Sequence, residues 1–185
     1  MTDVDVKAGD SGNADSFLRN VRRLLTVMLG LCILGAIGFL AAIPFIFAVT
    51  NGFFDPDQVE PAAEVAAFEW VTALMALRAM MSAIGFFFFR HLRRIVDSVS
   101  HGDPFAPVNA GRLRNMAWLV LAIQLLAIPM TSLAIWFDAA PYEPNVHHGS
   151  DGISLGALLL ALILFILARV FRTGAAMRDE LEGTV

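Results

Sequence analysis

One charged residue lies inside an otherwise apolar run and is the sharpest candidate for chemistry in this sequence. Arg78 stands within residues 68–89. A charge near the middle of a membrane costs about 2.5–3.5 kcal/mol on insertion scales, so its guanidinium should face other helices and have a partner. Gln124, and the Leu125 carbonyl that Pro129 leaves without an amide donor, are expected at a similar depth. A ligand or ion site and a structural lock between two helices both stay open.

Two adjacent histidines are a second candidate. His147 and His148 lie near Asp151, but a zinc site needs three or four converging ligands, so we expect a solvated loop and no metal. The sequence has no Walker loop, no Gly-x-Ser-x-Gly, no His-Glu-x-x-His and no dinucleotide fingerprint. A single cysteine, Cys32, allows no internal disulfide. We therefore expect no catalytic residue, no cofactor and no enzymatic activity.

The composition indicates that most of the chain lies in lipid. Of the 185 residues, 57% are hydrophobic and 16% charged, whereas a soluble domain has about 25% charged residues. Four apolar runs reach the length of about 20 residues that crosses a bilayer, namely residues 24–50, 68–89, 116–137 and 153–171. The sequence predicts an all-α integral membrane four-helix bundle over residues 17–185, after a disordered tail at 1–16. Gly38 and Ala42 are either suited to close helix contact or ordinary small residues of a membrane helix.

The basic residues predict which way the chain crosses the membrane. Every Lys and Arg except Arg78 precedes the first span, lies between the second and third, or lies at the end of the fourth or beyond it. Residues 51–69 and 138–152 contain none. The positive-inside rule therefore places both termini and the central loop, residues 90–115, in the cytoplasm. We expect the second, third and fourth helices to extend into the cytoplasm, the second as far as Ser98 or Ser100.

The central loop has turn chemistry as well as arginines. Its turn-forming residues are Gly102, Asp103, Pro104, Phe105 and Pro107. Glycine ends helices, and the proline and aspartate that follow favour a tight turn, so we predict a fixed turn at this place. Asn109 is a preferred residue type for the N-cap of the helix that follows.

The tail supplies a candidate partner for the loop. It contains the carboxylates Asp179, Glu180 and Glu182. Because the tail and the loop are expected on one side of the membrane, we predict that they dock, with Arg112 and Arg114 meeting the tail carboxylates. The alternatives are that the arginines only set the topology, or that they attract anionic lipid headgroups at about 1 kcal/mol each.

Two stretches resemble the signature motifs of a known family. They are Gly102–Trp118, GDPFAPVNAGRLRNMAW, and Phe171–Val185, FRTGAAMRDELEGTV. The family consists of small bacterial four-helix integral membrane proteins and is catalogued as a domain of unknown function. The resemblance covers about residues 20–185 and departs from the family at Val108, where an acidic residue is more common. Its members are often encoded beside a short Xre-type helix-turn-helix regulator. The resemblance therefore implies a multi-pass protein of the bacterial cytoplasmic membrane with a regulatory partner, and it supplies no catalytic residue.

These observations favour a regulatory or interaction protein. It would present the central loop and the tail to a cytoplasmic partner such as a small helix-turn-helix regulator. The alternative is a small transporter or channel that uses Arg78, in which several copies would have to assemble to form a path. The lipid bilayer and further copies of the chain are the other expected partners. The formal net charge of −4 argues against direct binding of nucleic acid.

Overall fold

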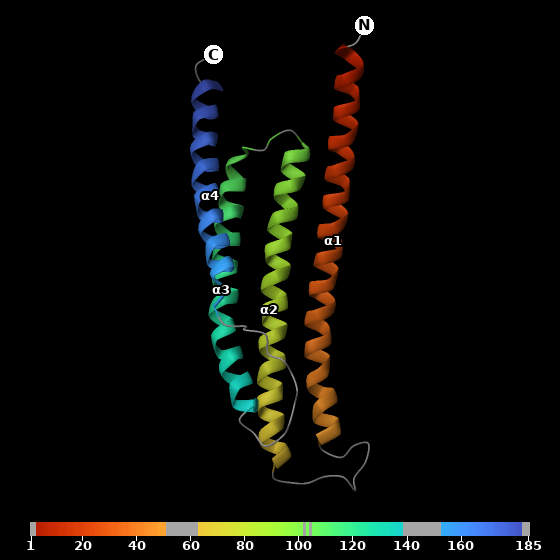
Figure 1. Cartoon of the computed structure of the whole chain (residues 1–185), viewed down its shortest axis with the longest axis vertical. Coiled ribbons are helices and arrows are strands. Elements are labelled where there is room, and N and C mark those ends of the chain that lie inside the picture. Colours follow the sequence, from red (N-terminus) through yellow and green to blue (C-terminus); the bar gives the residue numbers. More distant parts are fainter. Residues whose placement is uncertain (1–2, 51–62, 102, 104, 139–152, 183–185) are drawn as a thin grey trace.

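Four long helices form a bundle in the computed structural model, which describes residues 3–50, 63–101, 103, 105–138 and 153–182 (Figure 1). The helices are α1 (Asp3–Thr50), α2 (Ala63–Ser100), α3 (Pro107–Asp138) and α4 (Leu155–Glu182). Each contains a segment long and apolar enough to cross a membrane. The predicted all-α fold with four spans is confirmed, and the chain is a multi-pass membrane protein.

The helices pack in the order of the chain, with α1 on α2, α2 on α3 and α3 on α4. Among the described residues, no Cα atom of α1 lies within 8 Å of one in α3 or α4. Both termini and the turn between α2 and α3 lie at the same end of the bundle (Figure 1). We name this the arginine-rich end, because its helix segments carry Arg19, Arg22, Arg23, Arg90, Arg93, Arg94, Arg112, Arg114, Arg169, Arg172 and Arg178.

A buried cluster joins α3 to α4 through small side chains. Ala117 of α3 and Ala161 and Ala168 of α4 are almost fully buried in it. Small residues let two helix backbones approach closely, and such packing drives helix association in lipid, where water supplies no hydrophobic force. Phe88 and Ile95 of α2 pack against the same cluster. This part of the bundle therefore holds the arginine-rich ends of α2, α3 and α4 together.

The contact between α1 and α2 also depends on small residues. A Cβ atom on Gly35 would lie 3.1 Å from Oγ of Ser82, and one on Gly85 would lie 3.5 Å from Sγ of Cys32. A Cβ atom on Gly38 would meet nothing within 4 Å, which favours the alternative that Gly38 is an ordinary small residue of a membrane helix. The spacing of small residues in a sequence does not say which face of the helix meets its neighbour.

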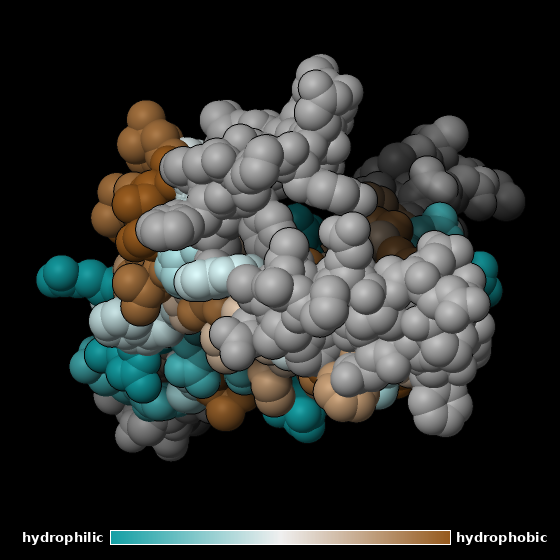
Figure 2. Space-filling model, turned by 90° about the horizontal axis from the view of Figure 1, so that it is seen from below, coloured by the Kyte–Doolittle hydropathy of each residue, from teal (hydrophilic) through white to brown (hydrophobic). Residues whose placement is uncertain are grey.

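Apolar side chains cover much of the outside of the bundle. Leu34 of α1, Leu125 of α3 and Leu162 of α4 are all exposed. Figure 2, seen from the end opposite the termini, shows apolar side chains at the outer edge of the molecule. Large exposed apolar surface is typical of proteins that contact a membrane, so these faces are suited to lipid.

The ends of two helices test the sequence-based boundaries. α1 begins at Asp3, so the segment 1–16, predicted to be disordered, is helical from Asp3 onward. Once an apolar run has formed a helix, each added residue brings one more hydrogen bond without the cost of a new nucleus, so polar residues can extend it. α2 ends at Ser100, which confirms the predicted end of the second helix at Ser98 or Ser100.

Candidate functional site

The turn between α2 and α3 folds back onto the last turn of α2. The amide of Asp103 donates to the carbonyl oxygen of Ser98 at 3.3 Å, and the hydroxyl of Ser98 donates to the carbonyl oxygen of Asp103 at 2.7 Å. The carbonyl groups at a helix end have no partner within the helix, so these bonds tie the turn to α2. Gly102 and Pro104, two of the predicted turn residues, lie outside the described residues.

The start of α3 differs from the prediction. The helix begins at Pro107, and proline is well tolerated there because the first amides of a helix have no intrahelical acceptor. Asn109 therefore lies within the first turn of α3, where its backbone N–H donates to the carbonyl oxygen of Ala106 at 2.8 Å. The predicted N-cap role of Asn109 is wrong because the helix starts two residues earlier.

Asn109 instead joins α2 to α3 from a fully buried position, with an exposed fraction of 0%. Its Nδ2 donates to Oγ of Ser98 at 3.0 Å, and its Oδ1 accepts from Nη1 of Arg112 at 2.9 Å. Nη1 of Arg112 also donates to the carbonyl oxygen of Arg94 at 2.9 Å. A buried amide without partners would cost about 1–3 kcal/mol, so this network favours one arrangement of the two helices.

The last part of α4 meets the turn through an ion pair and an aromatic contact. Nη1 of Arg178 lies 2.7 Å from Oδ1 of Asp103. The ring centroids of Phe105 and Phe171 are 5.4 Å apart, and a Cβ atom on Gly174 would lie only 3.2 Å from Cδ1 of Phe105. We name these five residues the clasp. The absence of a side chain on Gly174 is what allows the Phe105 ring to lie against α4.

The tail and the loop thus meet, but through residues other than those predicted. In the ion pair between them, the turn supplies the carboxylate of Asp103 and the tail supplies the guanidinium of Arg178. Arg112 is engaged with α2 and α3. Arg114 and Asp179 line one pocket, yet no ion pair joins them in the described part of the chain. Glu180 is exposed on α4, and the side chain of Glu182 lies outside the described residues.

α1 is tied to the same end of the bundle through Arg22, which the sequence-based reasoning did not single out. Nη2 of Arg22 lies 2.6 Å from Oδ1 of Asp97 and donates to Oγ of Ser100 at 3.2 Å. The sequence does contain a signal for this ion pair, because Asp97 is the one acid in the basic stretch 90–101. An acid in such surroundings is a natural partner for an arginine of a neighbouring helix.

Arg78 and Gln124 are not joined. Arg78 is partly buried on α2 and makes no hydrogen bond or ion pair within the described residues. Nε2 of Gln124 donates to the carbonyl oxygen of Ser154 at 3.2 Å, so the structure gives Gln124 a partner other than the predicted one. The segment with His147 and His148 lies outside the described residues, and the residues that are described contain no group of three metal-binding side chains.

Comparison with known proteins identifies a family. The model of a family described as "Protein of unknown function (DUF2975)" matches residues 53–185. The match includes the second, third and fourth helices, and with them the whole of the clasp. No curated protein and no solved structure gives a significant match.

Proposed function

The chain belongs to the DUF2975 family, and we propose that it is a regulatory membrane protein whose clasp binds a cytoplasmic protein partner. One observation carries the proposal. Three large apolar side chains are exposed at the arginine-rich end of the bundle, which the positive-inside rule favours as the cytoplasmic end. Phe105 is 45% exposed, and Val108 and Met177 are each 57% exposed. We name these three residues the apolar patch. Exposed apolar groups with a polar surround are typical of surfaces that bind proteins.

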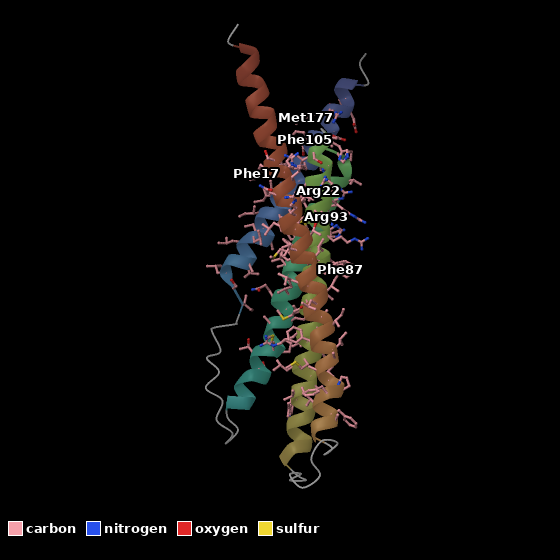
Figure 3. The ribbon with its side chains drawn as sticks, turned by 90° about the vertical axis from the view of Figure 1, so that its right-hand side faces the viewer. Phe17, Arg22, Phe87, Arg93, Phe105 and Met177 are labelled. Atoms are coloured by element: carbon pink, nitrogen blue, oxygen red, sulfur yellow. The ribbon has the colours of Figure 1, made fainter. Side chains whose placement is uncertain are left out.

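The clasp holds Phe105 against the part of α4 that carries Met177. Phe105 lies against Gly174. Met177 follows Gly174 by three residues, so Gly174 and Met177 lie on one face of α4. Val108 is the second residue of α3 and therefore lies close to the connection between α2 and α3. Figure 3 shows Phe105 and Met177 at the same end of the bundle. The Asp103–Arg178 ion pair flanks the patch, so the surface combines an apolar centre with charged groups at its side.

The modest strength of the ion pair also supports a binding role. Both side chains are about half exposed, and an exposed pair contributes only about 0.2–1 kcal/mol to stability. The pair therefore adds little to the strength of the bundle. It does align the end of α4 with the turn, which matters for a surface that has to match a partner.

The distribution of charge supports a cytoplasmic orientation of the patch. The arginines gather at the end that carries the patch, and a positively charged end is retained in the cytoplasm. Given the likeness to a bacterial membrane family, we place the chain in the bacterial cytoplasmic membrane. A small helix-turn-helix regulator is the partner class that this likeness suggests. In this proposal the chain positions or sequesters such a regulator and carries out no chemical step.

Photo-crosslinking in cells tests the proposal. A photoreactive amino acid at position 108 or 177 should crosslink to the same small cytoplasmic protein. The matched control is position 162, because Leu162 is equally exposed on α4 but lies in the apolar part. The control should crosslink to lipid only. If positions 108 and 177 gave only lipid and other copies of the chain, the proposal would be wrong.

In the alternative, a small oligomeric transporter or channel that uses Arg78, several copies would have to form the path. Since α1 and α4 do not approach each other in the described residues, one copy would not surround a path. The packing of the helices in chain order is better suited to holding the arginine-rich end in place.

A further inference from the structure

A pocket of about 330 Å³ opens beside the clasp, between the start of α3 and the last turns of α4. Small residues form much of its wall, among them Ala110, Gly111 and Ala175. Its charged groups are Arg114, Arg172 and Asp179. Ala110 and Ala175 are buried, so the floor of the pocket belongs to the packed interface between the two helices and is not a gap between loose side chains.

The charges of the pocket suit a phosphate group. Two guanidinium groups and one carboxylate leave a net charge of +1, which matches the single negative charge of a phosphodiester. Arg114 and Arg172 are both exposed, and neither makes a hydrogen bond or ion pair within the described residues, so their donors are free for a ligand. The planar fork of an arginine side chain matches the oxygens of a phosphate with two parallel hydrogen bonds.

The position of the pocket along the bundle indicates where the phosphate comes from. Arg172 directly follows the apolar run 153–171. Trp118, one helical turn beyond Arg114, is 61% exposed, and its ring centroid lies 5.6 Å from that of Phe165. Exposed tryptophan is typical of the boundary between membrane and water. The pocket therefore lies where lipid headgroups lie, with exposed apolar side chains on the side where acyl chains would run.

We propose that this pocket binds the phosphodiester of an anionic phospholipid. Arg114 and Arg172 hold the phosphate oxygens, while the small residues between them leave room for the headgroup. Binding of this kind joins the end of α4 to the start of α3 next to the clasp, and it does not depend on a protein partner. A lipid without net charge, such as phosphatidylcholine, has the same phosphodiester but also a positively charged ammonium group. That group would be repelled by the two arginines, so phosphatidylcholine should bind less tightly than an anionic phospholipid.

Native mass spectrometry of the delipidated full chain in detergent tests this proposal, with phosphatidylglycerol, phosphatidylcholine and inorganic phosphate as separate probes. Arg114→Gln and Arg172→Gln should each weaken phosphatidylglycerol binding by about fivefold, the effect expected for one arginine near a membrane surface. Arg169→Gln is the matched control, because Arg169 is exposed on α4 but does not line the pocket. It should leave the affinity unchanged.

Filling the pocket without changing its charge gives an independent test. A Cβ atom on Gly111 would meet nothing within 4 Å, so Gly111→Leu should fold well and block the pocket. The control is Gly30→Leu, at an equally open position on α1. Equal phosphatidylglycerol affinity in Gly111→Leu and Gly30→Leu would overturn the proposal. So would an equal effect of Arg169→Gln and Arg172→Gln, or binding of inorganic phosphate at this site without any preference for phosphatidylglycerol over phosphatidylcholine.

Discussion

Replacing Asn109 with alanine should destabilise the bundle by about 1–3 kcal/mol. The side chain is fully buried and forms hydrogen bonds of 3.0 Å to Ser98 and 2.9 Å to Arg112. Each such bond contributes about 0.5–1.5 kcal/mol net, so the loss of these two bonds accounts for about 1–3 kcal/mol. The loss should not be much larger, because Ser98 keeps its bond to Asp103 and Arg112 keeps its bond to Arg94.

Reversible unfolding in detergent micelles, followed by circular dichroism, measures the free energy of unfolding. Asn115→Ala is the matched control, because Asn115 is the same residue type on the same helix but is exposed. Its effect should stay within about 0.5 kcal/mol. A double-mutant cycle of Asn109→Ala with Ser98→Ala should show a coupling energy of at least about 0.5 kcal/mol, as expected for two residues in one hydrogen-bond network.

Two results would refute this reasoning. One is an Asn109→Ala variant no less stable than Asn115→Ala, which would mean that the buried amide gains nothing from its partners. The other is additivity of the Asn109 and Ser98 variants, which would mean that the two side chains do not interact. Either result would remove the network as the support of the turn.

Three further predictions concern the clasp, the helix packing and the orientation. Gly174→Leu should lower the free energy of unfolding by about 1–3 kcal/mol through overpacking, and Phe105→Ala in the same chain should remove most of that loss, because a Cβ atom at position 174 already lies 3.2 Å from the Phe105 ring. Ala161→Leu should cost a similar amount in the same assay, since Ala161 is buried between α3 and α4. In a background without the native cysteine, His147→Cys in intact cells should react with a membrane-impermeant maleimide, whereas His101→Cys should not. The reverse labelling pattern would contradict the proposed orientation.

The four spans could be predicted from the sequence because the bilayer sets strict requirements. A span needs about 20 apolar residues, and only a helix satisfies every backbone group within one segment. The end of α2 at Ser100 could also be predicted, since Leu92, Ile95 and Val99 continue the helical spacing beyond the apolar run. The start of α1 could not, because the polar residues from Asp3 onward have no apolar period of their own.

The contacts of the clasp could not be predicted in the same way. Many arginines and several acids share one end of the bundle, so charge alone allows many pairings, and only the positions of the helices select Asp103 with Arg178. The glycine at position 174 is a weak signal, because other helix glycines such as Gly30 and Gly111 have no close neighbour. Glycine within a helix costs about 1 kcal/mol relative to alanine, so its presence in α4 suggests that a neighbouring group, in this case Phe105, comes close.

The most direct test of the proposed function is crosslinking from position 108 in cells that carry charge-reversed clasps. Asp103→Arg and Arg178→Asp each replace the ion pair by two like charges at neighbouring positions, so each alone should reduce the yield of the crosslinked cytoplasmic protein. The double reversal restores an opposite-charge pair, and we expect it to restore the yield. Equal yields in all four chains, or a product that contains only lipid and copies of the chain itself, would contradict a partner surface built by the clasp.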